Sequence, residues 1–146
     1  MFFDTSDLKD SEIYLKLVDT KQAIPEKYYL PAYKFDICLL DHTIIGKCDL
    51  RVGYNQSIYY AGNIGYNIDE KYRGNRYSLK ACKLLFKLAK KHQMDYVYIT
   101  CVPDNKASNR ICILAKGKLL EAAEVPKNHN MYEMGYRTVN VYKIEI

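Results

Sequence analysis

The sequence predicts an α/β (α+β) domain, a mixed and mostly antiparallel sheet of six to seven strands with a central parallel β-α-β crossover and flanking helices. Three observations carry this prediction. Strand patterns fill the first half of the chain, an amphipathic helical pattern follows, and strand patterns then resume around a second helix. With 146 residues and a hydrophobic fraction of 49%, we expect a single domain over residues 1–146.

Four strands are expected in the first half. Residues 12–18 and 43–52 alternate polar and apolar side chains, and residues 32–40 are rich in aromatic and β-branched side chains. Residues 63–69 complete the set, because a period of two is typical of strands. The intervening residues 22–31 contain two prolines, which predict a loop or a short irregular helix.

The hydrophobic period changes in residues 75–91. Ala81, Leu85 and Leu88 recur on one side, whereas lysines recur on the other. This pattern predicts an amphipathic helix of about four to five turns. Its lysine face is interpreted as a solvated surface, with a nucleic-acid patch as the alternative.

A strand and a second helix follow. Residues 95–101 are rich in β-forming side chains, and a Pro-containing turn comes next. Asp104 or Asn105 is expected to cap a helix that runs to about Lys116 and ends at Gly117.

Two strands close the chain at residues 118–125 and 137–146, with a polar loop over 127–136. In this order, the fourth strand, the first helix and the fifth strand form a right-handed crossover. Such a unit places a ligand where its first strand ends and its helix begins.

Composition excludes several classes of protein. The start of the chain lacks a basic leader with an apolar run, and no apolar stretch approaches the length of a membrane span, so a cytoplasmic protein without a membrane partner is expected. Five widely spaced cysteines without zinc-ligand spacing indicate a reducing compartment and no metal site. The net charge of +5 favours an anionic partner, and supports nucleic acid only weakly.

One strand-turn-helix segment, residues 64–78, contains the pattern most typical of a binding site. Its turn at Gly74 enters a helix whose first N–H groups lack internal partners, which makes an anion site. Arg73 and Arg76 add charged donors for the same anion. Phosphate is the expected guest.

This segment resembles the coenzyme A loop of the GNAT acetyltransferases, R/Q-x-x-G-x-G/A. The second helix begins Asn105-x-x-Ser108-x-Arg110, similar to the N-x-x-S-x-R of the branch that acetylates ribosomal-protein N-termini and related amines. The resemblance covers residues 64–117 and the order of the remaining strands. It implies direct transfer of an acetyl group from acetyl-CoA, the co-substrate, to a primary amine.

The resemblance also implies a set of contacts. Backbone groups of the strand before the loop hold the pantetheine arm, and the Asn105 amide contacts it, with an N-cap role as a compatible alternative. Two residues depart from the family pattern. Arg76 stands where the loop usually has its second glycine, and Ser78 stands where it has glycine or alanine. The implied coenzyme-binding residues are Tyr66, Asn67, Ile68, Arg73, Gly74, Asn75, Arg76, Tyr77, Ser78, Asn105, Ser108 and Arg110.

A proton donor for the leaving thiolate is implied on the second helix. Many relatives have a tyrosine seven residues after the asparagine, and Cys112 stands there in this chain. A thiol can donate a proton, but a small buried helix residue is the alternative interpretation. Tyr142 on the last strand and Tyr132 in the preceding loop are the substitutes.

A base or a water chain must accept the proton of the amine, because an amine of pKa about 10.4 is mostly protonated at neutral pH. Asp49 on the third strand and Glu133 in the last loop are the candidates. His129 in that loop has a suitable intrinsic pKa.

Two other functions stay open. One is a non-catalytic acyl-CoA-binding module of the same fold, and the other is an RNA-associated protein. The acceptor amine is also open among a protein N-terminus, a lysine, a polyamine, an aminoglycoside and another small amine. Acceptor choice is expected in the loops 22–31, 53–62 and 127–136, and an exposed edge strand could pair in a homodimer.

Overall fold

The computed structural model describes residues 1–146, which form two antiparallel sheets and four α-helices. The elements in chain order are β1 (Ile13–Lys21), the 3-10 turn η1 (Pro25–Lys27), β2 (Ala32–Leu39), β3 (Ile44–Arg51), α1 (Ile58–Ala61), β4 (Ile64–Ile68), the 3-10 turn η2 (Glu70–Tyr72), α2 (Tyr77–Lys91), β5 (Tyr96–Cys101), α3 (Lys106–Leu114), β6 (Lys118–Glu124), α4 (Asn130–Glu133) and β7 (Thr138–Glu145).

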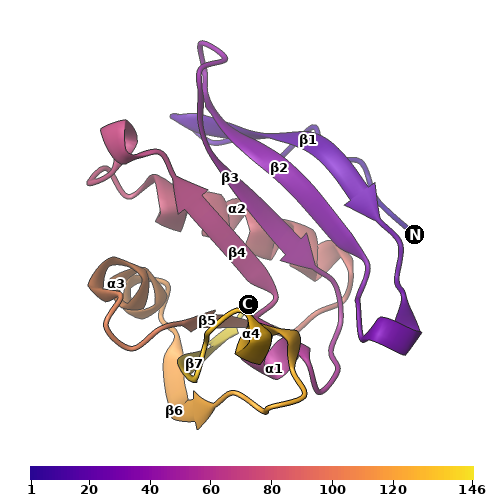
Figure 1. The fold of residues 1–146 in the computed structure, drawn as a ribbon. Helices are drawn as coiled ribbons and strands as arrows, with labels where there is room; N and C mark the ends of the chain where they lie inside the picture. The colour runs from indigo at the N-terminus through magenta and orange to yellow at the C-terminus, as the bar shows by residue number, and fades with distance from the viewer.

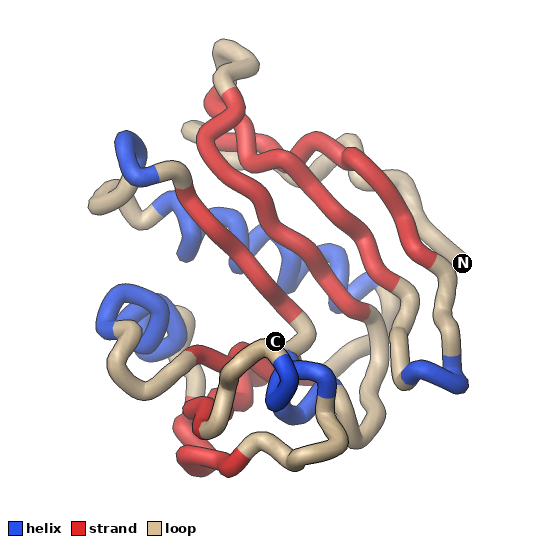
Figure 2. The backbone as a smooth tube through the Cα atoms, in the orientation of Figure 1, coloured by secondary structure: helices blue, strands red, loops and turns tan.

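The first sheet has the order β1-β2-β3-β4, and every neighbouring pair is antiparallel. Helix α2 crosses one face of this sheet, and no helix lies over the other face (Figures 1 and 2). The helix buries the apolar stripe that its sequence predicts, including Ala81, Leu85 and Leu88. The β3–β4 register places Asp49 opposite Gly65 and Cys48 opposite Tyr66.

The second sheet has the order β5-β7-β6 and is also antiparallel. The crossover β4-α2-β5 joins the two sheets. The larger core cluster takes side chains from both of them, for example Phe35 and Leu50 from the first and Ile99 and Ile144 from the second. One continuous core therefore fixes where the sheets lie relative to each other.

The fold class predicted from the sequence is confirmed, and all seven expected strands are present within a few residues of their expected bounds. One detail differs, because β4 and β5 do not pair as parallel neighbours within one sheet. The short helices α1 and α4 lie in segments expected as a turn region and a polar loop. Four residues carry too little periodicity to separate these states.

The end of α3 also differs in detail from the expectation. The helix ends at Leu114, and Lys116, with φ 65°, takes the left-handed conformation that was expected of Gly117. Gly117 is required for another reason: a Cβ there would lie 2.8 Å from the Cys112 carbonyl oxygen. No helix is long and apolar enough to span a membrane.

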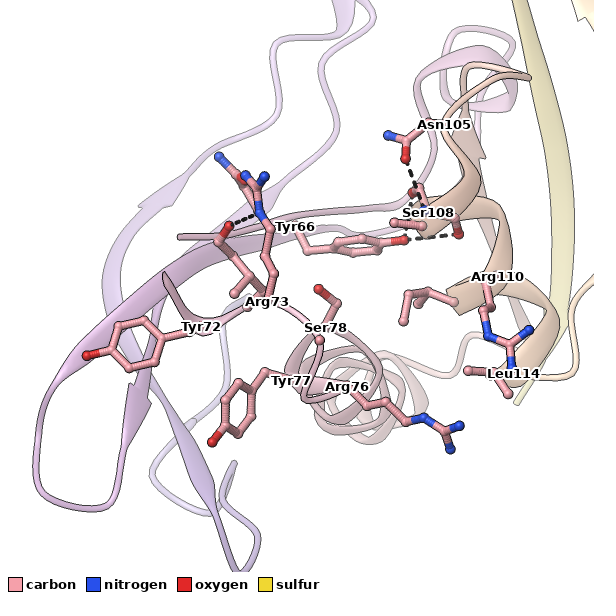
Figure 3. A pocket seen from close by; sticks show the side chains of 15 residues that line it. Tyr66, Tyr72, Arg73, Arg76, Tyr77, Ser78, Asn105, Ser108, Arg110 and Leu114 are labelled. Atoms are coloured by element: carbon pink, nitrogen blue, oxygen red, sulfur yellow. Dashed lines mark hydrogen bonds between the residues drawn. The ribbon is translucent and has the colours of Figure 1, made fainter. Parts of the chain in front are cut away.

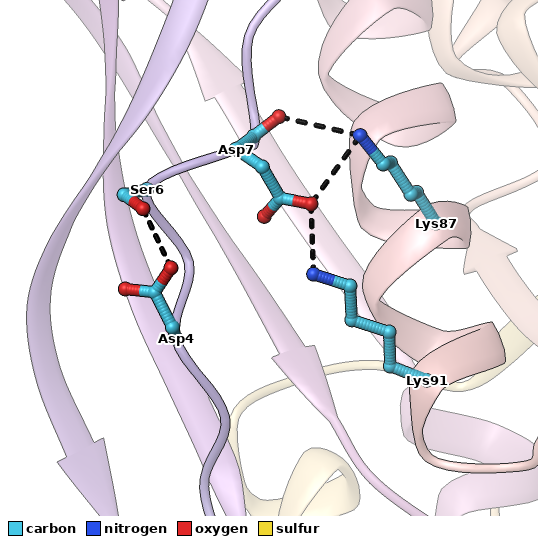
Figure 4. Close-up of polar contacts among 5 residues, drawn as sticks. All are labelled: Asp4, Ser6, Asp7, Lys87 and Lys91. Atoms are coloured by element: carbon cyan, nitrogen blue, oxygen red, sulfur yellow. Dashed lines mark hydrogen bonds and ion pairs between the residues drawn. The ribbon is translucent and has the colours of Figure 1, made fainter.

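The carboxylate of Asp7 connects the N-terminal segment to α2. Asp7 accepts from Lys91 Nζ at 2.8 Å and lies 3.4 Å from Lys87 Nζ (Figure 4). The two lysines are one helical turn apart, so a single side chain can meet both. The bond from Lys91 lowers the pKa of Asp7 below its usual value.

Candidate active site

The strands β4 and β5 meet at Asn63 and separate beyond it. The Asn63 backbone N–H donates to the Tyr98 carbonyl at 2.7 Å, and its Oδ1 accepts from Tyr98 N–H at 2.9 Å. Its Nδ2 donates to the carbonyls of Arg51 at 3.0 Å and Gly53 at 2.9 Å, and the residue is fully buried. The preceding Gly62 has φ 80° and lies against the β5 backbone, where a side chain would not fit. We call this hydrogen-bonded point at Gly62 and Asn63 the vertex. The strands β4 and β5 diverge from it.

A cavity of about 480 Å³ lies between β4, the start of α2 and α3 (Figure 3). We call it the arginine cavity, because Arg73, Arg76 and Arg110 line it and no aspartate or glutamate does. The residues expected to bind coenzyme that line it are Tyr66, Asn67, Ile68, Arg73, Gly74, Arg76, Tyr77, Ser78, Asn105, Ser108 and Arg110.

Asn75 is the one member of the expected set outside this lining. It is exposed, and its Nδ2 donates to the Tyr72 carbonyl at 3.2 Å within the turn. Its side chain therefore stabilises the turn conformation, while its neighbours line the cavity.

The start of α2 presents unpaired donors to the arginine cavity. Arg76 precedes the helix with φ 60°, and no side chain caps this end. The first N–H groups of the helix are therefore free, as an anion site requires. Arg73 Nε donates to the Ile68 carbonyl at 2.9 Å, which fixes that guanidinium beside the end of β4. Arg73 and Arg76 leave the turn in different directions in Figure 3.

The start of α3 forms the opposite wall. Asn105 Oδ1 accepts from the Ser108 backbone N–H at 3.1 Å, so the expected N-cap is confirmed. The Asn105 Nδ2 makes no hydrogen bond within the chain and stays free to donate to a ligand. Both roles expected of this amide are thus geometrically compatible.

A second and larger cavity, about 960 Å³, opens on the other side of Tyr66. We call it the wide cavity. It lies among the ends of β1 and β2, the vertex, the end of β5 and the segment 130–139, and more than half of its lining residues are hydrophobic. Tyr66, Asn105 and Ser108 line both cavities, so the two meet at these residues.

A hydrogen bond spans this junction. Tyr66 Oη lies 2.8 Å from Ser108 Oγ and connects β4 to α3 across the gap between the splayed strands (Figure 3). Burial raises the pKa of the Tyr66 phenol far above its usual value. The phenol therefore stays protonated, so it can donate a hydrogen bond as well as accept one.

Two cysteines lie behind the junction. Cys101 ends β5 and lines the wide cavity, and its interactions with Cys112 and Ser108 lower the pKa of its thiol. Cys112 is fully buried and lines neither cavity, and its contact with Cys101 raises the pKa of its own thiol. The alternative interpretation of Cys112, as a small buried side chain on a helix, agrees with this placement.

The other two expected catalytic residues also lie outside both linings. Asp49 accepts from the Gly65 backbone N–H at 2.9 Å and lies 3.6 Å from Arg51, so its carboxylate holds β4 against β3. Tyr142 is buried and donates to Asn109 Oδ1 at 2.8 Å. Burial raises the pKa of this phenol. The geometry gives neither side chain direct access to a bound substrate.

The alternative candidates lie in the last loop. His129 is buried, its Nδ1 accepts from the Met131 backbone N–H and its Nε2 lies 3.1 Å from the Ser57 carbonyl. Both ring nitrogens are therefore engaged in structural contacts with the chain. Glu133 and Tyr132 line neither cavity. No three His, Cys, Asp or Glu side chains converge as a metal site.

The sequence did not reveal two asparagines whose hydrogen bonds hold the elements around the junction in place. Asn109 donates to the Val102 and Asn105 carbonyls, and its Oδ1 accepts from Tyr142 and Asn140. This amide thereby fixes α3 to the ends of β5 and β7. Asn63 does the same for the vertex. A lone asparagine carries no motif, so only its partners reveal the role.

The two antiparallel sheets joined by the β4-α2-β5 crossover are consistent with the GNAT fold that the sequence predicts. The chain belongs to this family, because the model of the acetyltransferase (GNAT) domain matches residues 4–114. The resemblance inferred from the coenzyme A loop and the second helix is confirmed. No curated protein sequence matches the chain.

Solved structures of ribosomal-protein acetyltransferases share the fold. A ribosomal L7/L12 alpha-N-protein acetyltransferase in complex with coenzyme A has 17% identity, a TM-score of 0.65 and coverage of 94% of this chain and 96% of that chain. The acetyltransferase that modifies the N-terminal serine of L7/L12 from Salmonella typhimurium has 22% identity, a TM-score of 0.58 and coverage of 83% and 66%. The ribosomal-protein-S5-alanine acetyltransferase from Vibrio fischeri has 17% identity, a TM-score of 0.60 and coverage of 78% and 61%.

The length of the chain differs from that of several of these structures. It spans between 61% and 66% of the first four matched chains. With identities below 25%, these likenesses establish the fold.

Proposed function

We propose that this chain is an N-acetyltransferase that moves the acetyl group of acetyl-CoA directly to a primary amine. The observation that carries the proposal is the meeting of two cavities at Tyr66, Asn105 and Ser108. The smaller cavity is basic, and the larger one is lined mostly by hydrophobic residues. Two reactants that enter from opposite sides would meet at these three residues, and holding them there supplies on the order of 7 to 11 kcal/mol of the barrier.

The arginine cavity fits the phosphates of coenzyme A. Three guanidinium groups and the free N–H groups of α2 face it without an opposing carboxylate. We assign the phosphate contacts to the turn residues Arg73 to Ser78, in which Asn75 stabilises the turn, and to Arg110. The backbone of β4 from Tyr66 to Ile68 and the Asn105 amide would hold the pantetheine.

Acetyl-CoA, when bound, supplies the activated acetyl group, and the residues of the chain position it. Tyr66 Oη and Ser108 Oγ hold each other at 2.8 Å, so both hydroxyls are fixed at the junction. Because no carboxylate lines the wide cavity, we assign the proton of the attacking amine to water. Asp49 then acts as a positioning residue through Gly65, and Cys112 and Tyr142 as structural residues behind Cys101 and Asn109.

We also propose that residues 1–146 act as one cytoplasmic acetyltransferase domain. The larger core cluster joins both sheets, and all five cysteines are buried and unpaired, which supports a reducing compartment. A homodimer through an exposed edge strand stays a prediction. The edge β6 is a candidate, because Leu119 and Leu120 on it are exposed.

Titration calorimetry with acetyl-CoA tests the proposal, with Arg110→Gln as the variant and Lys106→Gln as its control. Both are exposed cations on α3, but only Arg110 lines the arginine cavity. Micromolar binding that weakens about tenfold or more in Arg110→Gln and not in Lys106→Gln is expected. Turnover with a panel of amines must accompany it. Absent binding overturns the assignment of the cavity, and binding without turnover indicates the non-catalytic module.

A further inference from the structure

The wide cavity has an uneven charge. Lys21, Lys34 and Arg51 line it, and no aspartate or glutamate does. The loops that border it contribute Glu26 and Glu133, which are exposed and lie outside the lining. A substrate in this cavity therefore meets ammonium and guanidinium groups and no carboxylate.

The nearest carboxylates are already engaged. Asp19 lies 3.0 Å from Lys21. Asp49 accepts from the Gly65 backbone N–H and lies 3.6 Å from Arg51. Neither carboxylate lines the cavity, although both are cross-strand neighbours of Lys34. Each one pairs with a lining cation, Asp19 with Lys21 and Asp49 with Arg51, and so holds that cation in place.

Lys34 has no such partner. It lies on β2 between Asp19 on β1 and Asp49 on β3 in the strand register, yet it forms no ion pair within 4.0 Å. Its side chain is exposed and lines the wide cavity. No carboxylate holds the ammonium group at ion-pair distance, so it can bind an anion in the cavity.

Arg51 is held in position before any ligand arrives. Its Nη1 donates to the Gly62 carbonyl at 2.9 Å, and its Nη2 faces Asp49. A guanidinium has five N–H donors, so further donors remain for a ligand. Because the Arg51 backbone N–H bonds the Asn63 carbonyl at 2.7 Å, this residue lies beside the vertex, and its side chain lines the wide cavity.

We propose that the amine acceptor carries an anionic group, a carboxylate or a phosphate, which Arg51 and Lys34 bind while the amine points to the junction. The inference rests on the proposed acetyl transfer and narrows its acceptor class. Polyamines and aminoglycosides add several cations to a cavity lined by cations, and like charges in such a site repel. An amine with a nearby anion instead neutralises this lining and is oriented by it.

Acetylation of matched acceptor pairs tests the inference. β-Alanine against β-alaninamide isolates a carboxylate, 2-aminoethyl phosphate against ethanolamine isolates a phosphate, and Ser-Glu-Ala-amide against Ser-Gln-Ala-amide isolates a peptide side chain. Spermidine is the polycation. In each accepted pair, kcat/KM is expected to be at least about tenfold higher for the anionic member. The pair with the larger ratio tells a carboxylate acceptor from a phosphate acceptor.

Variants assign the preference to residues. Lys34→Gln is expected to lower the anionic-to-neutral ratio about threefold, and Arg51→Gln to lower it about tenfold. Lys34 makes no structural bond, so its variant keeps the test valid if Arg51→Gln folds poorly. Lys47→Gln is the control, because Lys47 lies on β3 with Arg51 but pairs with Asp36 outside the lining. Its ratio is expected to stay unchanged.

The outcomes separate the two proposals. Turnover of neutral amines or spermidine at equal or higher kcat/KM overturns the inference and leaves acetyl transfer standing. A preference for anions that survives both Lys34→Gln and Arg51→Gln also overturns it. Bound acetyl-CoA with no turnover of any amine overturns the proposed function, and the inference falls with it.

Discussion

The arginine cavity and the wide cavity share three residues but are built in different ways. The arginine cavity comes from the end of β4 with the turn that follows, and from the start of α3. The wide cavity collects side chains from the ends of β1 and β2, from β3, from the vertex, from β5 and from residues 130–139. A site formed by contiguous segments leaves a pattern in the sequence, whereas one gathered from distant segments does not.

The largest expected effect is a loss of stability on substitution of Asn63, because this residue fixes the vertex between the strands that border both cavities. Asn63→Ala removes the partners of the Arg51 and Gly53 carbonyls and of the Tyr98 N–H, all near the buried vertex. Each orphaned group costs about 1 to 3 kcal/mol, so the free energy of unfolding should fall by roughly 3 to 5 kcal/mol. Urea denaturation measures it.

The control for this vertex variant lies four residues further along the chain, on β4. Asn67 is exposed and its side chain makes no hydrogen bond, so Asn67→Ala should change stability by less than about 0.5 kcal/mol. Equal losses in the two variants would show that Asn63 does not pin the vertex.

The rate of thiol alkylation distinguishes Cys101, which lines the wide cavity, from the cysteines buried elsewhere. Cys101 lines the wide cavity and has a lowered pKa, whereas burial raises the pKa of Cys82 to about 12. Because the thiolate is the reactive form, iodoacetamide should alkylate Cys101 about tenfold or more faster than the other four cysteines at neutral pH. Peptide mass mapping identifies the site, and Cys101→Ser should remove the fast phase. A fast phase on another cysteine would contradict this placement.

The junction itself is tested by Tyr66→Phe. Loss of the bond to Ser108 should lower the free energy of unfolding by about 1 kcal/mol and turnover by about tenfold. Acetyl-CoA affinity, measured by calorimetry, should change less than about threefold, because the phosphate contacts remain. Tyr72→Phe is the control, since Tyr72 lines only the arginine cavity and its hydroxyl makes no hydrogen bond. A similar turnover loss in both variants would remove the special role of the junction.

Two substitutions of Arg76 distinguish the effect of backbone strain from the effect of charge in the arginine cavity. Its φ of 60° suits glycine, so Arg76→Gly should raise the free energy of unfolding by up to about 1 kcal/mol while weakening acetyl-CoA binding about threefold to tenfold. Arg76→Ala removes the charge and keeps the strain, so it should weaken binding equally without the gain in stability. Thermal unfolding and calorimetry distinguish the two.

The smallest effect is expected far from both cavities. Asp7→Asn removes a partly exposed ion pair and should cost less than about 1 kcal/mol at neutral pH. Because the folded-state pKa of Asp7 is lowered, its contribution is complete above about pH 4 and is lost as the pH falls through the lower folded value. The difference in unfolding free energy between wild type and variant should therefore be smaller at pH 3 than at pH 7. Asp4→Asn, which loses only a contact with Ser6, should show no such dependence.

The sequence by itself determined the seven strands, the two long helices and the coenzyme loop. Period, caps and turn residues act over a few neighbours, and eleven of the twelve expected coenzyme residues line one cavity for that reason. It could not place the catalytic candidates Cys112, Tyr142 and Asp49 relative to a substrate, because their environment depends on neighbours far along the chain.

Only the tertiary structure decided the rest. Asn63 pins β3, β4 and β5 together through one amide, and the splay that follows divides the expected sheet into two. The same splay joins Tyr66 to Ser108, 42 residues apart, and gathers the cations Lys34 and Arg51 on one wall. Strand register and long-range hydrogen bonds determine these contacts, and the local hydrophobic pattern of the sequence predicts neither of them.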